Sequence, residues 1–394
     1  MKKMGSILGL KIGLAIFCAM AALSAAAYAE DAKDAKPAWF TPEAVKNALG
    51  LSIYLQGGYT YNPDSTSNSI SDSENDFRVF DNKANSFTLD LVELIFTKET
   101  TTTAVGYKVK ISAGETAKWI HANGLGSPAA NPNNPDPFDL TEAYVSYIAP
   151  IGNGLRFDAG KFATFIGAEV IEALDDPNYS RSFLFNYAEP LTHTGVKGSY
   201  VFNDNVNAAL FLVNGWDDAS DNNDAKSVGV SLNLVSGDLF SGYINYLTGP
   251  ENSGDNHDNR SLLDLVATIK PLKPLTIILN ADFGRNQQDS PVLPSQTWSG
   301  ISGIVKYDFN ETYSISARGE TFSAPYGAPN LPAAGPNATP GQELTEFTLT
   351  PEVRFANGIT ARLEYRHDHS NLDSFDNNTK STQNTYSVSA MYRW

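Results

Sequence analysis

Five carboxylates and one arginine lie close together in a single stretch of the chain, between Gly167 and Gly195. They are Glu169, Glu172, Asp175, Asp176, Glu189 and Arg181, and four aromatic side chains are interspersed among them. Paired carboxylates hydrolyse glycosides when they lie about 5 Å or about 6.5–9.5 Å apart, which Glu169 and Glu172 could do on one turn of a short helix. Acids also line pore constrictions, where charged rings set ion preference. The elements that hold the stretch must decide between these chemistries.

The N-terminus is organised as a secretory signal peptide. Lysines 2, 3 and 11 precede an apolar run over 12–23 and a small-residue motif that ends at Ala29, so we expect cleavage after Ala29 and export of the mature chain. Cys18 is not expected to carry a lipid, because Phe17 stands where lipoprotein processing needs a small residue. Since Cys18 is the one cysteine, the mature chain has no disulfide, zinc-thiolate site or cysteine nucleophile.

Composition points to an acidic chain without a membrane-spanning helix. The net charge of −16 becomes −19 once the three lysines of the signal peptide are removed, because residues 1–29 contain no acid. Phosphate binding needs clusters of lysine and arginine, so we expect no nucleic-acid partner. After the signal peptide no stretch approaches the run of about 18 apolar residues that a transmembrane helix requires, although 42% of the residues are hydrophobic.

From Leu51 onward the chain alternates stretches of period-two hydrophobicity with polar breaks, and about 16 such stretches of roughly 10 residues can be distinguished. In the last one, Tyr386, Val388 and Tyr392 share one face with the terminal Trp394. Serines, Met391 and Arg393 occupy the other face. The same alternation recurs over 359–368 and 275–284, so the sequence predicts a protein made of long strands with one apolar and one polar face.

The polar breaks also alternate in length. Tight turns are expected at 203–205, 236–238, 271–274, 309–312 and 356–358, and the intervening breaks run from about 10 to about 30 residues. Short periplasmic turns and long extracellular loops are typical of outer-membrane barrels. A soluble β-sandwich or extracellular adhesin is the alternative, but it would not give uniformly long strands that pair an apolar face with a polar one. We therefore predict an all-β fold, a transmembrane antiparallel β-barrel of about 16 strands.

This prediction fixes the domain organisation and places the acidic stretch. Residues 1–29 form the signal peptide, 30–50 a short periplasmic segment and 51–394 the barrel. The acidic stretch falls between the strands expected at 154–162 and 193–202, which makes it the third long loop and the longest. Its aromatic side chains would expose much apolar surface if it stood in solvent, so we expect it to fold inward and narrow the channel of a barrel this wide.

The polar faces of the predicted strands supply the opposite charge. The basic residues expected to face the lumen are Lys108, Lys110, Arg156, Lys197, Arg318, Arg354, Arg362, Arg366 and Arg393. Together with the acids of the loop they form the predicted pore constriction, in which a basic wall opposes an acidic loop across a narrow aqueous gap. Such an arrangement filters dipolar and charged solutes and needs no cofactor.

The run "EVIEALDDPNYSRSFLFNYAEPLTHTGV", with the preceding "DAGKF" and the barrel pattern down to "YRW", resembles the OmpL-like family of β-barrel porins. In that family the loop more often has Asp-Asn where this chain has Asp175-Asp176. The resemblance implies an outer-membrane porin for passive diffusion of small hydrophilic solutes or ions. Expected partners are the outer membrane with its lipopolysaccharide, the solutes themselves and, as one candidate assembly, a homotrimer.

Other functions were weighed on specific residues. An outer-membrane barrel enzyme that hydrolyses lipid or glycan is the first alternative, and an adhesin or receptor is the second. We expect no enzyme, because the chain has only five histidines to serve as a catalytic base and no Gly-x-Ser-x-Gly elbow for a serine nucleophile. His193 is expected to anchor the loop's return to the wall. His367 and His369 around Asp368 could bind a divalent cation, although such histidines are more often solvated.

The run "WDDASDNND" at 216–224 gathers four aspartates. It lacks the glycine and terminal glutamate of an EF-hand. Loose Ca²⁺ or Mg²⁺ bridging to lipopolysaccharide is therefore an alternative to plain solvation, and no dedicated metal site is predicted.

Overall fold

The computed structural model describes residues 46, 49–65, 74–125, 136–289, 295–329, 331 and 341–394. The predicted signal peptide and most of the predicted segment 30–50 lie outside these residues.

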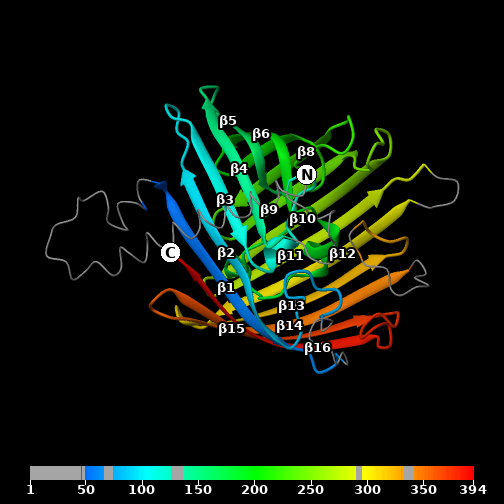
Figure 1. Cartoon of the computed structure of the whole chain (residues 1–394). Coiled ribbons are helices and arrows are strands. Elements are labelled where there is room, and N and C mark those ends of the chain that lie inside the picture. The colour runs from blue at the N-terminus through cyan, green and yellow to red at the C-terminus, as the bar shows by residue number, and fades with distance from the viewer. Residues whose placement is uncertain are drawn as a thin grey trace, which may run out of the picture.

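Sixteen antiparallel strands form one closed barrel in the described part of the chain (Figure 1). The strands are β1 (Leu51–Tyr61), β2 (Ser86–Lys98), β3 (Gly106–Ala113), β4 (Phe138–Ala149), β5 (Leu155–Ala163), β6 (Thr192–Asn203), β7 (Val206–Val213), β8 (Ser227–Ser236), β9 (Phe240–Pro250), β10 (Asn259–Leu272), β11 (Leu275–Asn286), β12 (Gln296–Asp308), β13 (Tyr313–Ala324), β14 (Gln342–Arg354), β15 (Ile359–Ser370) and β16 (Thr382–Arg393). Each strand pairs with its sequence neighbours, and β1 pairs with β16 to close the ring, from Tyr54 opposite Arg393 to Tyr61 opposite Tyr386.

The connections confirm the predicted strand order. All five predicted tight turns join consecutive strands, and the connection between β5 and β6, residues 164–191, is the third long one and the longest between described strands. We call it L3. It contains two short helical turns, η4 (Ala173–Asp175) and η5 (Leu184–Ala188). A third, η3 (Thr116–Lys118), lies in the connection between β3 and β4. No helix among the described residues is long and apolar enough to cross a membrane.

Burial along the strands is the reverse of that in a soluble protein. In β14 the polar Thr348 and Thr350 are fully buried, whereas Phe347 and Leu349 between and beside them are 48% and 36% exposed. The predicted faces of β16 behave alike: Tyr386 and Val388 are exposed and Ser387 and Ser389 are buried. Polar side chains thus point into the barrel and apolar ones form its outer surface, as the lipid-facing wall of a membrane barrel requires.

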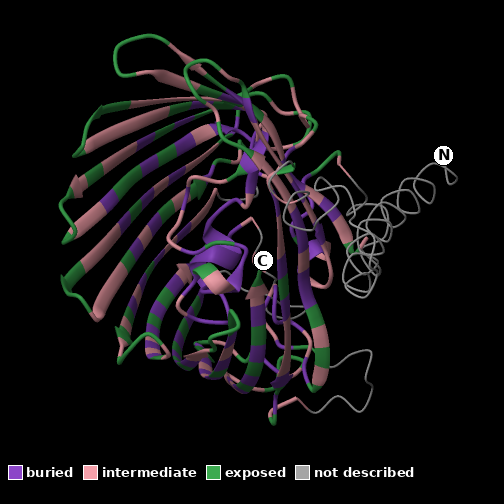
Figure 2. Ribbon diagram, turned by 90° about the vertical axis from the view of Figure 1, so that its left-hand side faces the viewer, coloured by how far each residue is buried: buried purple, intermediate pink, exposed green. Residues whose placement is uncertain are grey.

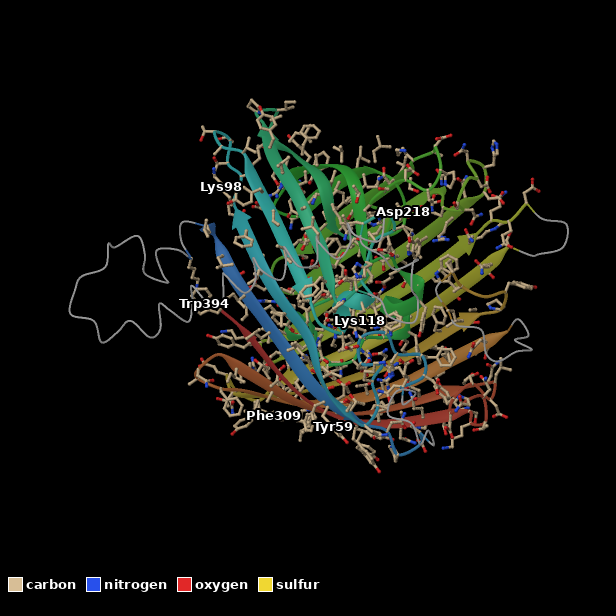
Figure 3. The ribbon with its side chains drawn as sticks, viewed as in Figure 1. Tyr59, Lys98, Lys118, Asp218, Phe309 and Trp394 are labelled. Atoms are coloured by element: carbon tan, nitrogen blue, oxygen red, sulfur yellow. The ribbon has the colours of Figure 1, made fainter. Side chains whose placement is uncertain are left out.

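Aromatic side chains contribute much of the outer surface. Phe87 is 84% exposed and its ring lies 4.8 Å from that of Tyr59, and Phe309 projects from the turn after β12 (Figure 3). The terminal Trp394 lies beside the start of β1, where the N–H of Ile53 donates to its carbonyl oxygen at 2.9 Å (Figure 3). Aromatic residues at the two rims are typical of barrels whose ends lie at the membrane interfaces.

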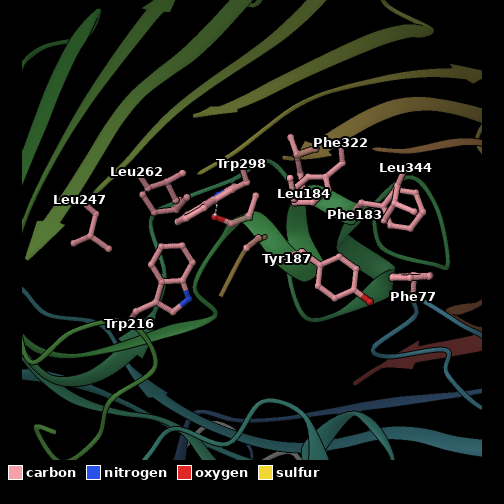
Figure 4. Packing of buried hydrophobic residues seen from close by; sticks show 14 of the residues in the cluster. Phe77, Phe183, Leu184, Tyr187, Trp216, Leu247, Leu262, Trp298, Phe322 and Leu344 are labelled. Atoms are coloured by element: carbon pink, nitrogen blue, oxygen red, sulfur yellow. Dashed lines mark hydrogen bonds between the residues drawn. The ribbon is translucent and has the colours of Figure 1, made fainter. Parts of the chain in front are cut away.

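The apolar core of the molecule lies inside the barrel and is built around L3, whose short helix stands within the ring of strands (Figure 2). Phe183, Leu184 and Tyr187 pack in one buried cluster with Phe322 of β13 and Leu344 of β14 (Figure 4). A second cluster joins Ile171, Tyr179 and Phe185 of L3 to Tyr54 of β1 and Leu91 of β2. Burial of each such side chain stabilises the fold by about 1.5–3 kcal/mol, so L3 is held by its own aromatic residues.

Candidate functional site

The backbone of L3 is anchored by carboxylates of the wall. Glu320 of β13 accepts hydrogen bonds from the N–H groups of Phe183 and Leu184, both at 2.7 Å. In the same way Glu364 of β15 accepts a hydrogen bond from the N–H of Tyr179 at 2.6 Å. These N–H groups precede or begin a short helix or a bend, where the chain supplies no acceptor of its own. Wall acids therefore satisfy the donors that L3 leaves unpaired.

Three buried arginines on the same side satisfy the carbonyl oxygens of L3, and we call them the arginine wall: Arg318 of β13 with Arg362 and Arg366 of β15. Each guanidinium is at most 2% exposed. They donate to the carbonyl oxygens of Ser180 at 2.7 Å, Asp176 at 2.7 Å and Arg181 at 2.6 Å, respectively. The planar guanidinium presents several donors in a fixed fork, which allows each arginine to bind both L3 and a carboxylate of the wall.

Four of the five predicted acids of L3 are engaged in ion pairs. Glu169 pairs with Arg318 at 2.7 Å, Asp175 with Arg393 at 2.5 Å, Asp176 with Arg181 at 3.0 Å and Glu172 with Lys110. The expected aqueous gap between an acidic loop and a basic wall is wrong for Glu169, Glu172 and Asp175, which contact wall residues directly, whereas Asp176 pairs within L3. The aromatic rings of L3 are buried against wall residues, and this packing places the acids of L3 beside the basic side chains of the wall.

The other predicted basic residues pair within the wall. Lys108 pairs with Glu142 at 2.8 Å, Arg156 and Lys197 with Asp158 at 2.9 and 2.8 Å, and Arg354 with Asp308 at 2.5 Å. Their side chains are about a quarter to a third exposed, unlike those of the arginine wall. The predicted lumen-facing set thus divides into residues that hold L3 and residues that remain open to solvent in the barrel.

The charge of Glu172 is fixed by its partner. Burial alone would raise the pKa of this carboxyl, but the adjacent ammonium of Lys110 outweighs burial and lowers the pKa to about 2. Glu169 is bound twice, because it also accepts a hydrogen bond from the N–H of Ser182 at 2.9 Å. Each carboxylate of the pair considered for acid/base catalysis is therefore bound to a buried cationic side chain.

Two cavities flank L3. One, of about 760 Å³, opens among the long connections and is lined by Arg78, Glu189, Asp217, Glu251 and Arg260 among others. The other, of about 610 Å³, lies between L3 and the wall formed by β3, β4, β8 and β9, and its lining includes Lys108, Lys110, Glu142, Ser231 and Tyr243. Leu191, the last residue of L3, lines both. The two cavities thus approach each other beside the returning end of L3.

Two acids that line the first cavity, Glu251, which is buried, and Asp217, which is partly buried, have raised pKa values. Burial raises the pKa of Glu251 to about 7 and that of Asp217 to about 6. Both are structural acceptors: Glu251 binds the N–H of Trp216 at 2.7 Å, and Asp217 binds the N–H groups of Leu191 and Thr192 at 2.9 and 2.7 Å. Asp217 therefore fixes the end of L3, and both groups change charge close to neutral pH.

His193 lies where the sequence predicts an anchor for the loop. This fully buried residue of β6 contacts the carbonyl oxygen of Gly215 and the hydroxyl of Thr164, each at 3.0 Å. The alternative metal sites are not assembled. Asp368 points inward and pairs with Arg366 at 2.6 Å and Arg78 at 2.7 Å, whereas His369 is exposed on the opposite face.

The aspartates of 216–224 also separate. Asp218 accepts a hydrogen bond from the side chain of Asn123 at 2.8 Å, and Asp221 pairs with Lys226. Asp217 is bound to the end of L3. Asp217, Asp218 and Asp221 therefore make separate structural contacts and do not share one metal site.

Sequence reasoning missed two residues beside L3. Asp264 of β10 and Asp282 of β11 are fully buried, and with Glu189 they form the one cluster of acidic groups with metal-ligand spacing among the described residues. Asp264 stands directly opposite Asp282 in the β10–β11 hairpin. Their similar distances from the turn at 271–274 indicated that the two acids lie near each other in the hairpin, although the register shift between Ile269 and Leu272 decides their exact pairing.

Solved structures with a similar architecture include outer-membrane channels and porins. The outer membrane channel DcaP of Acinetobacter baumannii has a TM-score of 0.57 at 12% identity over 87% of this chain and 96% of its own. OmpT of Vibrio cholerae in its trimer form has a TM-score of 0.55 at 12% identity over 87% and 98%, and the anion-selective porin from Comamonas acidovorans one of 0.53 at 8% identity over 87% and 98%. At these identities the likeness establishes the fold alone.

In sequence, the family model described as "Putative beta-barrel porin-2, OmpL-like" matches residues 48–394. The match covers the whole barrel and L3. No curated protein matches the chain.

Proposed function

The chain belongs to the OmpL-like β-barrel porins and is a porin of the bacterial outer membrane, and we propose that small hydrophilic solutes or ions diffuse passively along the side of L3 that faces β3, β4, β8 and β9. L3 narrows the barrel in this account and the arginine wall holds it in place. No chemical step and no cofactor is involved.

One observation carries this proposal. The cavity among the long connections and the cavity against β3, β4, β8 and β9 share a lining residue, Leu191. Where L3 faces β13 and β15, in contrast, buried ion pairs and hydrogen bonds join it to the wall. Solutes need hydrated space, and the space lies on the Leu191 side. The narrowest point of the path is expected beside this side chain.

The lining charges favour cations. In the cavity against β3 and β4 the acids Glu142, Glu169, Glu172 and Asp175 exceed Lys108 and Lys110, four against two. In the cavity among the long connections Glu74, Asp76, Glu189, Asp217 and Glu251 exceed Arg78 and Arg260, five against two. Charged linings set ion preference in pores, so we propose a weakly cation-selective porin.

Planar-bilayer recording of the purified barrel tests this function. We expect conductance without added substrate, and a reversal potential under a potassium chloride gradient that corresponds to cation preference. A reversal potential on the anion side would refute the cation preference, and a protein that inserts but does not conduct would refute the pore.

A barrel enzyme is the alternative from another class. The two acids considered for catalysis are held by Arg318 and Lys110, and His193 is fully buried. These contacts support a porin that catalyses no reaction. If the purified barrel turned over lipid or glycan substrates, and a Glu169→Gln variant lost this activity but still conducted, the enzyme would be favoured over the porin.

Assembly and surface partners are part of the same proposal. A homotrimer is supported by the trimer form of the structurally similar OmpT, and lipopolysaccharide is the expected neighbour of the long connections. Cross-linking in native membranes would distinguish a trimer from a monomer.

A further inference from the structure

We infer that Glu189, Asp264 and Asp282 form a binding site for one divalent cation, Ca²⁺ by size and ligand chemistry, which fastens the neck of L3 to β10 and β11. One carboxylate oxygen from each residue lies within 4.8 Å of the others. Oxygen ligands on opposite sides of a Ca²⁺ ion at 2.3–2.6 Å lie about 4.6–5.2 Å apart. The group therefore has the span of a coordination shell.

The three carboxylates lack a counter-charge of their own. All are at most 2% exposed, and no lysine, arginine or histidine among the described residues forms an ion pair with any of them, although ion pairs hold the other acids of L3. Asp264 and Asp282 are also direct cross-strand partners, an arrangement in which like charges destabilise a sheet. Burial of uncompensated charge is costly, so this position requires a positive group.

Asp282 points to a ligand independently of the spacing. Both of its carboxylate oxygens are buried without a hydrogen-bond partner, as is Oε2 of Glu189. Buried oxygens of this kind are rare in native proteins unless water or an ion satisfies them. A cation between the three residues would satisfy these oxygens together.

Asp264 is fixed in position by three neutral donors. It accepts hydrogen bonds from the side-chain amides of Asn245 and Asn280, both at 2.7 Å, and from the N–H of Gly167 at 3.0 Å. These donors orient the carboxylate but bring no positive charge, which a cation between the three residues would supply.

Both ends of L3 meet at this point. Gly167 lies near the start of the loop and Glu189 near its end. A Cβ built on Gly167, whose φ is +85°, would lie 1.8 Å from Oε2 of Glu189. Only glycine leaves room for that carboxylate and adopts this backbone conformation readily. Glu189 also lines the cavity among the long connections, which gives a cation a route to the site.

Terbium luminescence on the full-length barrel in detergent tests the site, because Trp298 lies next to it and can sensitise a bound ion: its Nε1 donates to the carbonyl oxygen of Ala188 at 3.2 Å (Figure 4). We expect chelator-stripped protein to bind Tb³⁺ with sensitised emission that about 1 mM Ca²⁺ displaces. The melting temperature should rise with Ca²⁺ and fall with chelator.

Two variants carry the test. Asp282→Asn with Glu189→Gln should weaken Tb³⁺ binding by at least about tenfold, since even outer-shell partners of metals contribute that much, and should remove the Ca²⁺ effect on melting. Asp139→Asn is the control for Asp282→Asn alone: it removes one charge from a wall carboxylate that already pairs with Lys161 at 3.3 Å, and should leave Tb³⁺ binding unchanged.

Wild-type protein that shows no sensitised emission, or equal emission from the double variant, would overturn the inference. If the double variant does not fold, Tb³⁺ emission of the wild-type protein is compared with that of the single variant Glu189→Gln, and equal emission would overturn the inference. A double variant that melts higher than wild type with or without Ca²⁺ would show that the carboxylates share protons instead. Binding is measured in detergent without conduction, so this result is independent of the proposed transport path.

Discussion

The two sides of L3 use the same kinds of charged residue for different purposes. Toward β13 and β15, Arg318, Arg362 and Arg366 are buried and joined to the loop by ion pairs and hydrogen bonds. Toward β3 and β5, Lys108 and Arg156 remain partly exposed and pair only within the wall, whereas Lys110 of β3 is buried and pairs with Glu172 of L3. Burial therefore separates residues that fix the constriction from residues that a solute can meet, and neither charge nor strand position alone makes that distinction.

Loss of an arginine on the buried side should have the largest effect. Arg318→Met removes the ion-pair partner of Glu169 and the nearer of the two partners of Glu346, both at 2.7 Å, and leaves the buried Glu169 uncompensated at a cost of about 3–5 kcal/mol. We expect L3 to detach, conductance to rise and residues of 164–191 to become sensitive to protease. Single-channel recording and limited proteolysis measure this.

Arg354→Met is the matched control, because Arg354 is about one-third exposed and pairs with Asp308 away from L3. It should leave conductance and the protease pattern as in wild type. Equal effects of the two substitutions would show that the buried arginines have no special role in holding L3.

The titrating acids of the open cavity should produce an intermediate effect. Burial raises the pKa of Glu251 from an ordinary value of 4.5 to about 7, so the fold favours the neutral carboxyl. The stability gained from this preference is complete below about pH 4.5 and is lost as the pH rises through about 7, by at most on the order of 3 kcal/mol.

Glu251→Gln is neutral at every pH and should melt with a weaker pH dependence than wild type between about pH 5 and about pH 8. Parallel curves for the two proteins would contradict the raised pKa. The cation preference of the wild-type pore should also increase over this interval, because Glu251 and Asp217 gain charge.

A lysine on the open side should give the smallest effect. Lys108→Gln removes one positive charge from the cavity lining without touching the arginine wall. Two unit charges at 4 Å interact by about 1 kcal/mol in water, so the ratio of cation to anion permeability should rise by at most about fivefold. Reversal potentials measure this ratio, and a shift toward anions would contradict the assignment of Lys108 to the path.

The fold was predictable because its signals are local. Period-two alternation, as in residues 386–394, and tight turns, such as that at 356–358, each depend on a few neighbouring residues. The long connection 164–191 followed from the strand order. These signals sufficed for the strand count, the exposed apolar faces and the position of L3.

The contacts of L3 were not predictable in the same way. A register counted from Leu272 opposite Leu275 would place Asp264 opposite Phe283, and only the register shift between Ile269 and Leu272 pairs it with Asp282. The approach of Glu189 depends in turn on strand tilt and stagger around the whole ring. The same geometry decides that Arg318 meets Glu169 while Arg354 does not. Contacts across the lumen therefore require the closed barrel.

The central claim is that L3 narrows the passage, and replacing residues 169–186 by a short Gly/Ser linker tests it most directly. The barrel's hydrogen bonds lie in its strands, so the variant should still insert and remain heat-modifiable. We predict a several-fold rise in single-channel conductance and a loss of cation preference. Unchanged conductance in a correctly inserted barrel would contradict the claim.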